Sequence, residues 1–304
     1  MYTYTWYQWL IFFYFYCFVG WVFESTYVSL KKKAFVNRGF LHAPMLPLYG
    51  SGAVIILFVA IPVKNQWYLV FLLGSLAATA LEYVTGVAME AMFKVRYWDY
   101  SDKKFNFQGQ ICLSSSLAWG VLSVLLTEFI HRPVERLVAE KIPALPEIIF
   151  AVIVSAGFAA DTAMSFAAAW KLRTILEKMT EIKADIEALQ TRLEELSSQK
   201  LEELSALKEE SFAWLTGVKE ESRERMAARK KAVEEALGGL KLDARQPLLK
   251  RLEHLKQYHH SVRVRPFHLR HSMLRRNPSA VSRRFDEALA EYKKRLEEWK
   301  KERR

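Results

Sequence analysis

Long apolar segments dominate the first 170 residues of this 304-residue chain. A helix needs about 20 consecutive, mostly apolar residues to cross the hydrocarbon core of a bilayer. Five segments meet or approach this length: residues 6–30, 48–63, 67–93, 111–130 and 148–170. The second is the shortest, and because only Lys64, Asn65 and Gln66 separate it from the third, we expect the two to form a tight helical hairpin. The sequence therefore predicts an all-α fold, a polytopic membrane helix bundle of about five spans.

The composition of the chain changes near Trp170. Residues 1–170 hold nearly all of the Phe, Tyr and Trp, whereas residues 171–304 are rich in Glu, Lys, Arg, Leu and Ala. A chain of this length commonly holds more than one domain, so we expect a boundary at this point. The predicted parts are a transmembrane domain at 1–170, a coiled coil at 171–239 and a basic segment with a C-terminal helix at 240–304.

Basic residues in the loops predict the orientation of the spans. Residues 1–8 hold aromatics in place of the basic start of a signal peptide, so we expect the first span to be retained. Two loops carry the positive charge: Lys31, Lys32, Lys33 and Arg38 after the first span, and Lys94, Arg96, Lys103 and Lys104 after the third. Cytoplasmic loops carry an excess of Lys and Arg, so we predict the N-terminus outside and the C-terminal half in the cytoplasm. The net charge of +11 then suits an anionic inner leaflet.

A third basic group, between the fourth and fifth predicted spans, counts against this orientation. It comprises Arg132, Arg136 and Lys141. Acidic residues surround it, at Glu135, Glu140 and Glu147. Residues 133–142 have a short amphipathic pattern, so we expect this segment to lie on the outer surface.

The sequence singles out Glu24, Glu82, Glu90 and Asp161 among the acidic residues inside the predicted spans. An ionisable side chain at this depth costs at least about 2.5 kcal/mol, and it normally faces a partner or a water-filled cavity. Glu82, Glu90 and Tyr83 share a broad helix face, because positions four apart advance by only about 40°. These residues are candidates for a solute- or ion-binding site. The alternative is that the acids lock the helices together by pairing with Arg38, Lys94 or Arg96.

The loops after the first and third spans differ from solvated linkers. Residues 37–52 are too apolar for a solvated loop and too rich in Pro and Gly for a helix. Non-helical backbone at membrane depth survives where it is buried in protein or lines a cavity, so a re-entrant loop is predicted here. Residues 96–112 mix aromatic and charged side chains in the same way. An aromatic belt at the membrane interface is the alternative for these aromatics.

Together the loops and the buried acids predict one polar chamber in the cytoplasmic half of the bundle. The spacing of His and acidic residues supports no defined metal site, and the cofactor is unknown. The two cysteines, Cys17 and Cys112, fall in or beside different spans and give no disulfide framework. The candidate substrate- or ion-binding residues are Glu24, Asn37, Arg38, His42, Glu82, Tyr83, Glu90, Arg96, Trp98, Asp99, Asn106 and Cys112.

Many of these residues belong to a pattern that resembles a known family. The pattern comprises Gly20-Trp21 with Glu24, Asn37-Arg38-Gly39-Phe40-Leu41 with Pro44, Pro47 and Tyr49-Gly50, Leu81-Glu82-Tyr83 with Glu90, Trp98-Asp99-Tyr100-Ser101, and Ile111-Cys112-Leu113. It resembles the CmpB-like family of ABC-transporter permeases over about residues 7–130. The resemblance implies a small bacterial multi-span protein, which we expect in the cytoplasmic (inner) membrane. Two positions depart from it: Ala43 replaces a Gly, and Gln110 replaces an Arg, which removes a positive charge.

Transport is the first of three functions that the sequence leaves open. The chain has no Gly-x-x-x-x-Gly-Lys-[Ser/Thr] phosphate loop, so an ATP-driven permease would need a separate ATPase subunit. Five spans are few for a path in one chain, which favours a homo-oligomer, or a channel or carrier mechanism. An intramembrane enzyme acting on a lipid-like substrate would draw on His42, Cys112, Asp99 and Glu82, although no nucleophile motif surrounds Cys112. A membrane scaffold is the third.

Apolar residues recur at heptad spacing in the charged half of the chain. They are Leu172, Ile175, Met179, Ile182, Ile186, Leu189, Leu193 and Leu196. This spacing predicts a long cytoplasmic coiled coil over residues 172–238, about 100 Å in length at 1.5 Å per residue. Its partner is either the same helix of a second subunit, which gives a homodimer, or the final segment folded back. That segment has a second stripe at Phe285, Leu289, Tyr292, Leu296 and Trp299.

Arg and His residues cluster at 259–276, with Arg283 and Arg284 beyond. Such clusters attract anionic lipid head groups or nucleic acid without reading a sequence. In a membrane protein we expect membrane lipid to be the partner, because no nucleic-acid-binding module accompanies the charge. An ordinary solvated turn is the alternative.

Overall fold

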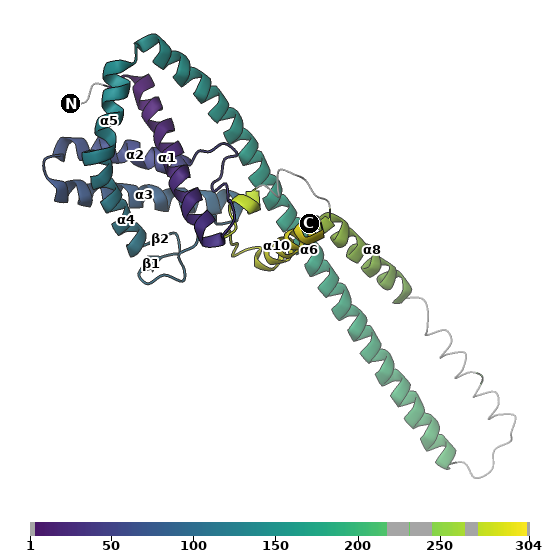
Figure 1. Ribbon diagram of the computed structural model, residues 1–304. Helices are drawn as coiled ribbons and strands as arrows, with labels where there is room; N and C mark the ends of the chain where they lie inside the picture. The colour runs from purple at the N-terminus through teal and green to yellow at the C-terminus, as the bar shows by residue number, and fades with distance from the viewer. Residues whose placement is uncertain (1–3, 218–230, 232–244, 265–272, 303–304) are drawn as a thin grey trace. The chain divides into compact units, whose positions relative to one another are not determined.

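The computed structural model describes residues 4–217, 231, 245–264 and 273–302 (Figure 1). Its helices are α1 (Trp6–Lys32), α2 (Pro47–Ala60), α3 (Trp67–Phe93), α4 (Leu113–Leu125), α5 (His131–Glu135), α6 (Ala144–Gly217), α8 (Arg245–Val264) and α10 (Asp286–Glu302). A short 3-10 turn follows α2, and a two-stranded antiparallel hairpin pairs β1 (Asn106–Phe107) with β2 (Ile111–Cys112). Helices therefore make up the regular structure of the described chain apart from this small hairpin, which confirms the all-α class.

Four helical segments of the described chain are long and apolar enough to cross a membrane: Trp6–Lys32, Trp67–Phe93, Leu113–Lys141 and Ala144–Gln199. They contain four of the five predicted spans. The other, residues 48–63, falls on a shorter apolar helix at Pro47–Val63. A crossing by this helix stays a prediction, because about 20 residues are usually needed to span the hydrocarbon core, whereas α2 has 14 residues and the 3-10 turn after it adds 3.

The fourth span differs from its predicted bounds at both ends. Ile111 and Cys112 lie in β2, so the helix begins at Leu113. It continues to Lys141 through two π-helical turns, Leu126–Ile130 and Arg136–Lys141. Pro133 lies between these turns and lacks the N–H that would bond back along the helix, and wider turns are a common way to accommodate such a loss. Residues 133–142 therefore extend the fourth helix instead of forming a separate segment.

The irregular segment after α1 is shorter than the predicted loop at 37–52. It ends at Leu46, and α2 begins at Pro47. Proline favours the first position of a helix, because its fixed φ suits the helix and its missing N–H has no partner there anyway. The backbone N–H of Leu46 donates to the carbonyl of Cys17 at 2.9 Å, so the end of the loop lies against the middle of α1. This contact places irregular backbone beside an apolar helix, as a re-entrant loop requires.

The first four long helices pack in sequence order. α2 contacts both α1 and α3, and α3 contacts α4 (Figure 1). Their shared core includes Phe12, Leu57, Val70, Ala78 and Trp119. Large apolar side chains are also exposed on the outer faces of these helices, among them Phe23, Phe58, Leu76, Val84 and Val121. An apolar outer surface around an apolar core is what a bundle surrounded by lipid presents.

Contacts within the chain define two compact units. Unit 1 comprises Met1–Leu176 and Pro266–Arg304, and unit 2 comprises Glu177–Arg265. The C-terminal segment, defined here as residues 273–285, therefore packs with the membrane helices. Arg96 and Val281 exchange backbone hydrogen bonds of 2.7 and 2.9 Å, and Ser282 Oγ donates to the carbonyl of Lys94 at 2.5 Å. The loop after α3 thus holds the C-terminal segment through the backbone of both.

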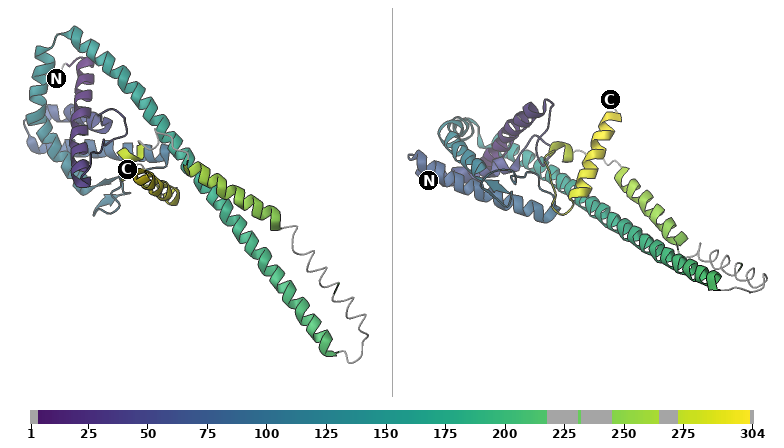
Figure 2. Two further views of the ribbon diagram at one scale, coloured as in Figure 1. Left: turned by 45° about the vertical axis from the view of Figure 1, so that its right-hand side comes forward. Right: turned by 90° about the horizontal axis from the view of Figure 1, so that it is seen from below.

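Unit 2 contains the second part of α6, and α8 lies beside it in both views of Figure 2. Met179, Ile182 and Leu193 of the predicted heptad stripe are buried there, as is Leu252 of α8. In unit 1, four members of the second predicted stripe are buried, namely Phe285, just before α10, and Leu289, Tyr292 and Leu296 of α10. Pairing of the long helix with a second subunit stays a prediction, and residues 218–230 and 232–238 of the predicted coiled coil lie outside the described residues.

Candidate functional site

A cavity of about 1060 Å³ opens between α1, α2, α3, α4 and the first part of α6. Most of its wall is apolar or aromatic. Three charged side chains line it, Glu24, Arg38 and Glu82, and Asn277 of the C-terminal segment reaches it as well. The volume lies at the upper end of the range of about 300–1,000 Å³ that is typical of small-molecule sites. Within the described chain, the structure therefore brings four of the predicted site residues together around one space: these three charged residues and Trp98.

Glu82 comes from α3 and is only 4% exposed. Tyr100 Oη donates to Glu82 Oε1 at 3.0 Å, and Trp119 Nε1 donates to Oε2 at 3.1 Å. Both donors are neutral. Within the described chain, Glu82 takes part in none of the ion pairs. Within the described chain, an acid in this position is thus satisfied by neutral donors and has no cation beside it.

Glu24 lies near the end of α1, and Tyr49 of α2 holds it. Tyr49 Oη donates to Glu24 Oε1 at 2.9 Å. This contact depends on Gly20, because a Cβ at that position would lie 2.3 Å from Tyr49 Cβ. Glu24 Oε2 lies 3.9 Å from Arg38 Nε, at the outer limit of an ion pair. The second acid of the cavity is therefore only weakly paired.

Arg38 follows Asn37 in the irregular segment, and its guanidinium is held mainly by neutral acceptors. Nη1 donates to Asn277 Oδ1 at 3.0 Å, and Nη2 donates to the carbonyl of Tyr97 at 3.3 Å. Burial lowers the pKa of Arg38 below its usual value, and the neighbouring Glu24 carboxylate opposes that shift. Asn37 points the other way: Trp21 Nε1 donates to its Oδ1 at 2.6 Å, so it fixes the loop to α1. Arg38 lines the cavity, and Asn37 positions it.

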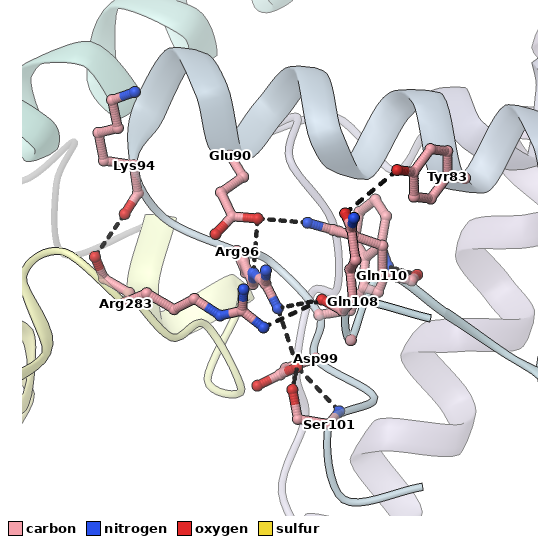
Figure 3. Close-up of polar contacts among 12 residues, drawn as sticks. Tyr83, Glu90, Lys94, Arg96, Asp99, Ser101, Gln108, Gln110 and Arg283 are labelled. Carbon is pink, nitrogen blue, oxygen red and sulfur yellow. Dashed lines mark hydrogen bonds and ion pairs between the residues drawn. The ribbon is translucent and has the colours of Figure 1, made fainter. Parts of the chain in front are cut away.

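Glu90 belongs to a second group, the Arg96 cluster, formed by Glu90, Arg96, Asp99 and Gln110 (Figure 3). Arg96 Nε lies 2.8 Å from Glu90 Oε2, and Arg96 Nη1 lies 3.6 Å from Asp99 Oδ1. Gln110 Nε2 donates to Glu90 Oε2 at 2.6 Å. Gly86 makes room for Gln110, because a Cβ there would lie 2.3 Å from Gln110 Oε1. In this cluster every charge has an opposite charge beside it, an arrangement suited to holding the loop on α3.

The glutamine that departs from the family pattern is thus part of the Arg96 cluster. Its side chain is buried, and it supplies Glu90 with a neutral donor where an arginine would add a positive charge. Arg96 already supplies that charge. With Gln in place of Arg at position 110, Glu90 therefore has one cationic partner and one neutral donor.

The remaining loop residues that the sequence singled out hold the loop together. Tyr83 Oη donates to Gln108 Oε1 at 3.3 Å, and Trp98 Nε1 donates to the carbonyl of Gln110 at 3.0 Å (Figure 3 labels Tyr83 and both glutamines). Asn106 Nδ2 donates to the carbonyl of Lys103 at 2.7 Å, within a turn. Of these residues only Trp98 lines the cavity.

Cys112 is buried at the start of α4, where its Sγ lies 3.1 Å from Ser114 Oγ. Burial raises the pKa of the Cys112 thiol, but hydrogen bonds from Ser114 and Ser115 lower it by more. Cys112 does not line the cavity, and neither does His42. The structure therefore does not gather the four residues on which the enzymatic alternative depends.

His42 joins α6 through Asp161. Its Nδ1 lies 2.9 Å from Asp161 Oδ1 and 3.0 Å from Ser165 Oγ. Asp161 also accepts the backbone N–H of His42 at 3.1 Å and that of Ala43 at 2.7 Å. Because the serine and the aspartate meet the same ring nitrogen, the group lacks the relay of a nucleophilic triad, in which the two partners occupy opposite nitrogens. Asp161 instead anchors the irregular segment on α6.

Four residues of the cavity escaped the sequence-based list. Tyr49 and Tyr100 lie within the family pattern, and their hydroxyls bond the two acids. Trp119 sits in an apolar run, and only its indole N–H distinguishes it from a core residue. Asn277 lies 239 positions after Arg38 and gave no local signal. Among the described residues, no group of three His, Cys, Asp or Glu side chains is placed to hold a metal ion.

The apolar helices and the irregular backbone against α1 indicate a polytopic membrane protein. A family model described as "Putative ABC-transporter type IV" matches residues 11–166, half of the chain. The protein belongs to this family, which confirms the resemblance drawn from the sequence, and the match includes the fifth predicted span as well. No curated protein and no solved structure matched the chain. The family and the apolar helices together indicate a membrane transport protein.

Proposed function

We propose that the protein carries a small or charged solute across the membrane and binds it in the cavity between Glu24, Arg38 and Glu82. The observation that carries this proposal concerns Glu82: this acid lies in an apolar helix and borders a large cavity, and among the described residues it has no cationic partner. Removing an ion from water costs several kcal/mol after relaxation, and neutral hydrogen bonds return only part of it. A carboxylate that serves structure alone would be expected to have a cation beside it, as Glu90 does.

The cavity faces the cytoplasm in this proposal. The loops that border it carry the basic residues at 31–38 and 94–104, and basic loops are retained on the cytoplasmic side. The N-terminus then lies outside and the C-terminal half inside, in the cytoplasmic membrane of a bacterium. The heptad stripe at 172–196 supports a homodimer, and the missing phosphate loop supports a separate ATPase subunit if transport is driven by ATP.

Flux in liposomes tests the proposal. Purified wild-type protein and the Glu82→Gln variant are reconstituted at equal density, and uptake of radiolabelled small organic cations, anions and neutral solutes is measured. We expect uptake of at least one class by the wild type and its loss in Glu82→Gln. Glu128→Gln is the matched control, because Glu128 lies outside the cavity and pairs with Arg132. Equal uptake by the wild type and Glu82→Gln contradicts the proposal, and a new lipid product detected by mass spectrometry supports the enzymatic alternative.

A further inference from the structure

We propose that the cavity binds an amphiphile with a cationic head group, such as a quaternary or protonated amine, with the head group near Glu24 and Glu82 and the apolar tail against α3, α4 and α6. This inference names the substrate class of the proposed transport function and rests on it for the role of the ligand. The binding itself rests on charge, aromatic surface and shape.

The charges around the cavity favour a cation. Two carboxylates line it, Glu24 and Glu82, and they lie within electrostatic range of each other. A single guanidinium faces them, and Arg38 already donates to Asn277 and to the carbonyl of Tyr97. Its distance of 3.9 Å from Glu24 leaves that carboxylate open to a closer partner. A cationic head group would bring the charge of this region to zero.

Aromatic rings surround the two acids. Tyr49 bonds Glu24 and Trp119 bonds Glu82, and the centroids of their rings lie 5.3 Å apart. Tyr100 and Trp98 also line the cavity. A cation over such ring faces is attracted to their π electrons, and aromatic cages are a common way to hold quaternary ammonium groups. The wall near the acids therefore fits a soft organic cation better than a hydrated inorganic one.

A further polar group of the cavity wall lacks a partner. Tyr97 lines the cavity and is 4% exposed, and within the described chain its hydroxyl has no hydrogen-bond partner. A buried hydroxyl without a partner destabilises the folded state, because it has lost its bonds to water. A ligand with a polar group next to its tail would satisfy it.

The rest of the wall is apolar and open. Met92 of α3, Val121 of α4 and Phe166 of α6 line the cavity, and 38%, 52% and 39% of their surfaces are exposed. These helices are membrane spans, so an opening between them faces the bilayer. A fully soluble solute would leave this apolar surface uncovered, whereas an alkyl chain would bury it, which favours binding.

Equilibrium dialysis tests the inference on the full-length protein in a neutral maltoside detergent. The probe is radiolabelled octyltrimethylammonium below its micelle concentration, and octyl sulfate and octanol are compared as the anionic and uncharged probes of equal tail length. We expect saturable binding of octyltrimethylammonium, at least tenfold weaker in Glu82→Gln and unchanged in Glu128→Gln. Octyl sulfate and octanol should bind at least tenfold more weakly than the cation. If Glu82→Gln fails to fold, Glu24→Gln should show the same loss, since Glu24 is the second acid facing the head group.

The outcomes separate the inference from the proposed function. Tighter binding of octyl sulfate than of the cation, or equal binding to the wild type and both acid variants, overturns the inference. Binding of the cation without any flux in liposomes keeps the inference and contradicts transport. Flux of another solute without binding of the cation keeps transport and overturns the inference. A Trp119→Phe variant adds a second readout, because it keeps an aromatic ring but removes the N–H that holds Glu82, and we expect weaker binding without loss of the fold.

Discussion

Glu82 and Glu90 lie about two turns apart on the same helix, in two regions that treat a buried acid differently. In the Arg96 cluster, Glu90 has a guanidinium at 2.8 Å and an amide donor at 2.6 Å. In the cavity, Glu82 has a tyrosine and a tryptophan, both neutral, and no ion pair within the described residues. The first region contains the cation that compensates its acid, and the second has space beside its acid. We infer that the Arg96 cluster stabilises the fold and that the cavity binds a ligand.

This difference shows how the roles of two buried glutamates are distinguished. Burial in the membrane costs free energy for both carboxylates, and the partner of each one indicates whether its role is structural or ligand binding. A paired acid is expected to be sensitive to the loss of its partner in the folded state. An acid with neutral partners is expected to tolerate neutralisation but to lose its ligand. The predictions below use this contrast.

The largest effect is expected from Arg96→Met. It leaves Glu90 and Asp99 without their cation, and removing one member of a buried pair costs about 3–5 kcal/mol. The same variant loosens the loop, because Arg96 Nη1 also donates to the carbonyl of Gln108 at 2.8 Å. Chemical unfolding of the purified protein in detergent, followed by tryptophan fluorescence, measures the loss.

A double variant checks the physical reason for this loss. Glu90→Gln with Arg96→Met removes both charges of the closer pair, so it should recover part of the stability that Arg96→Met loses. If Arg96→Met is as stable as the wild type, the Arg96 cluster is not the structural element that the comparison requires.

A smaller loss is expected from Gly20→Ala on the cavity side. The new Cβ would lie 2.3 Å from Tyr49 Cβ, and overpacking of this kind typically costs about 1–3 kcal/mol. Because Tyr49 bonds Glu24, the variant should also weaken binding of the octyltrimethylammonium probe. Gly157→Ala is the matched control: nothing lies within 4 Å of its Cβ, so an exposed helix position should gain stability or stay unchanged. Equal stability of Gly20→Ala and Gly157→Ala would contradict the expectation that a Cβ at position 20 displaces Tyr49.

Asn277→Ala tests whether the C-terminal segment closes the cavity. It removes the bond to Arg38 Nη1 and the bond from Asn277 Nδ2 to the carbonyl of Gly39 at 2.9 Å. Each lost bond is worth about 0.5–1.5 kcal/mol, and more for the charged donor. Hydrogen exchange should rise in residues 273–285 and in the irregular segment, and stay unchanged in α3. Ser279→Ala is the control, because its hydroxyl makes only a 3.5 Å contact. Unchanged hydrogen exchange in Asn277→Ala would show that the backbone hydrogen bonds between Arg96 and Val281 are enough to hold the C-terminal segment in place.

Much of the bundle could be predicted from the sequence, because each span is a local property of the chain. The apolar run at 67–93 coincides with α3, and the polar residues at 64–66 fall in the turn before it. The cost of a buried charge is local as well, so Glu24, Glu82, Glu90 and Asp161 could be named, together with Arg38 and Arg96 as possible cationic partners. The neutral donor Trp119 could not be named, since it is 37 positions from Glu82, and neither could Asn277, which is 239 positions from Arg38. Periodicity gave no sign that residues 273–285 pack against the membrane helices.

The smallest effect on stability is expected from Glu82→Gln, and it sharpens the comparison most. A glutamine keeps the volume of the side chain: its carbonyl oxygen accepts from Trp119 Nε1, and its amide donates to the oxygen of Tyr100. Every hydrogen bond survives and a buried charge disappears, so stability should change by less than about 1 kcal/mol or rise. The same unfolding measurement as for Arg96→Met gives the value. If Glu82→Gln loses as much stability as Arg96→Met, Glu82 stabilises the fold, and both acids of α3 have a structural role. A stable Glu82→Gln that no longer binds the cationic probe would mean that this carboxylate is kept for its ligand.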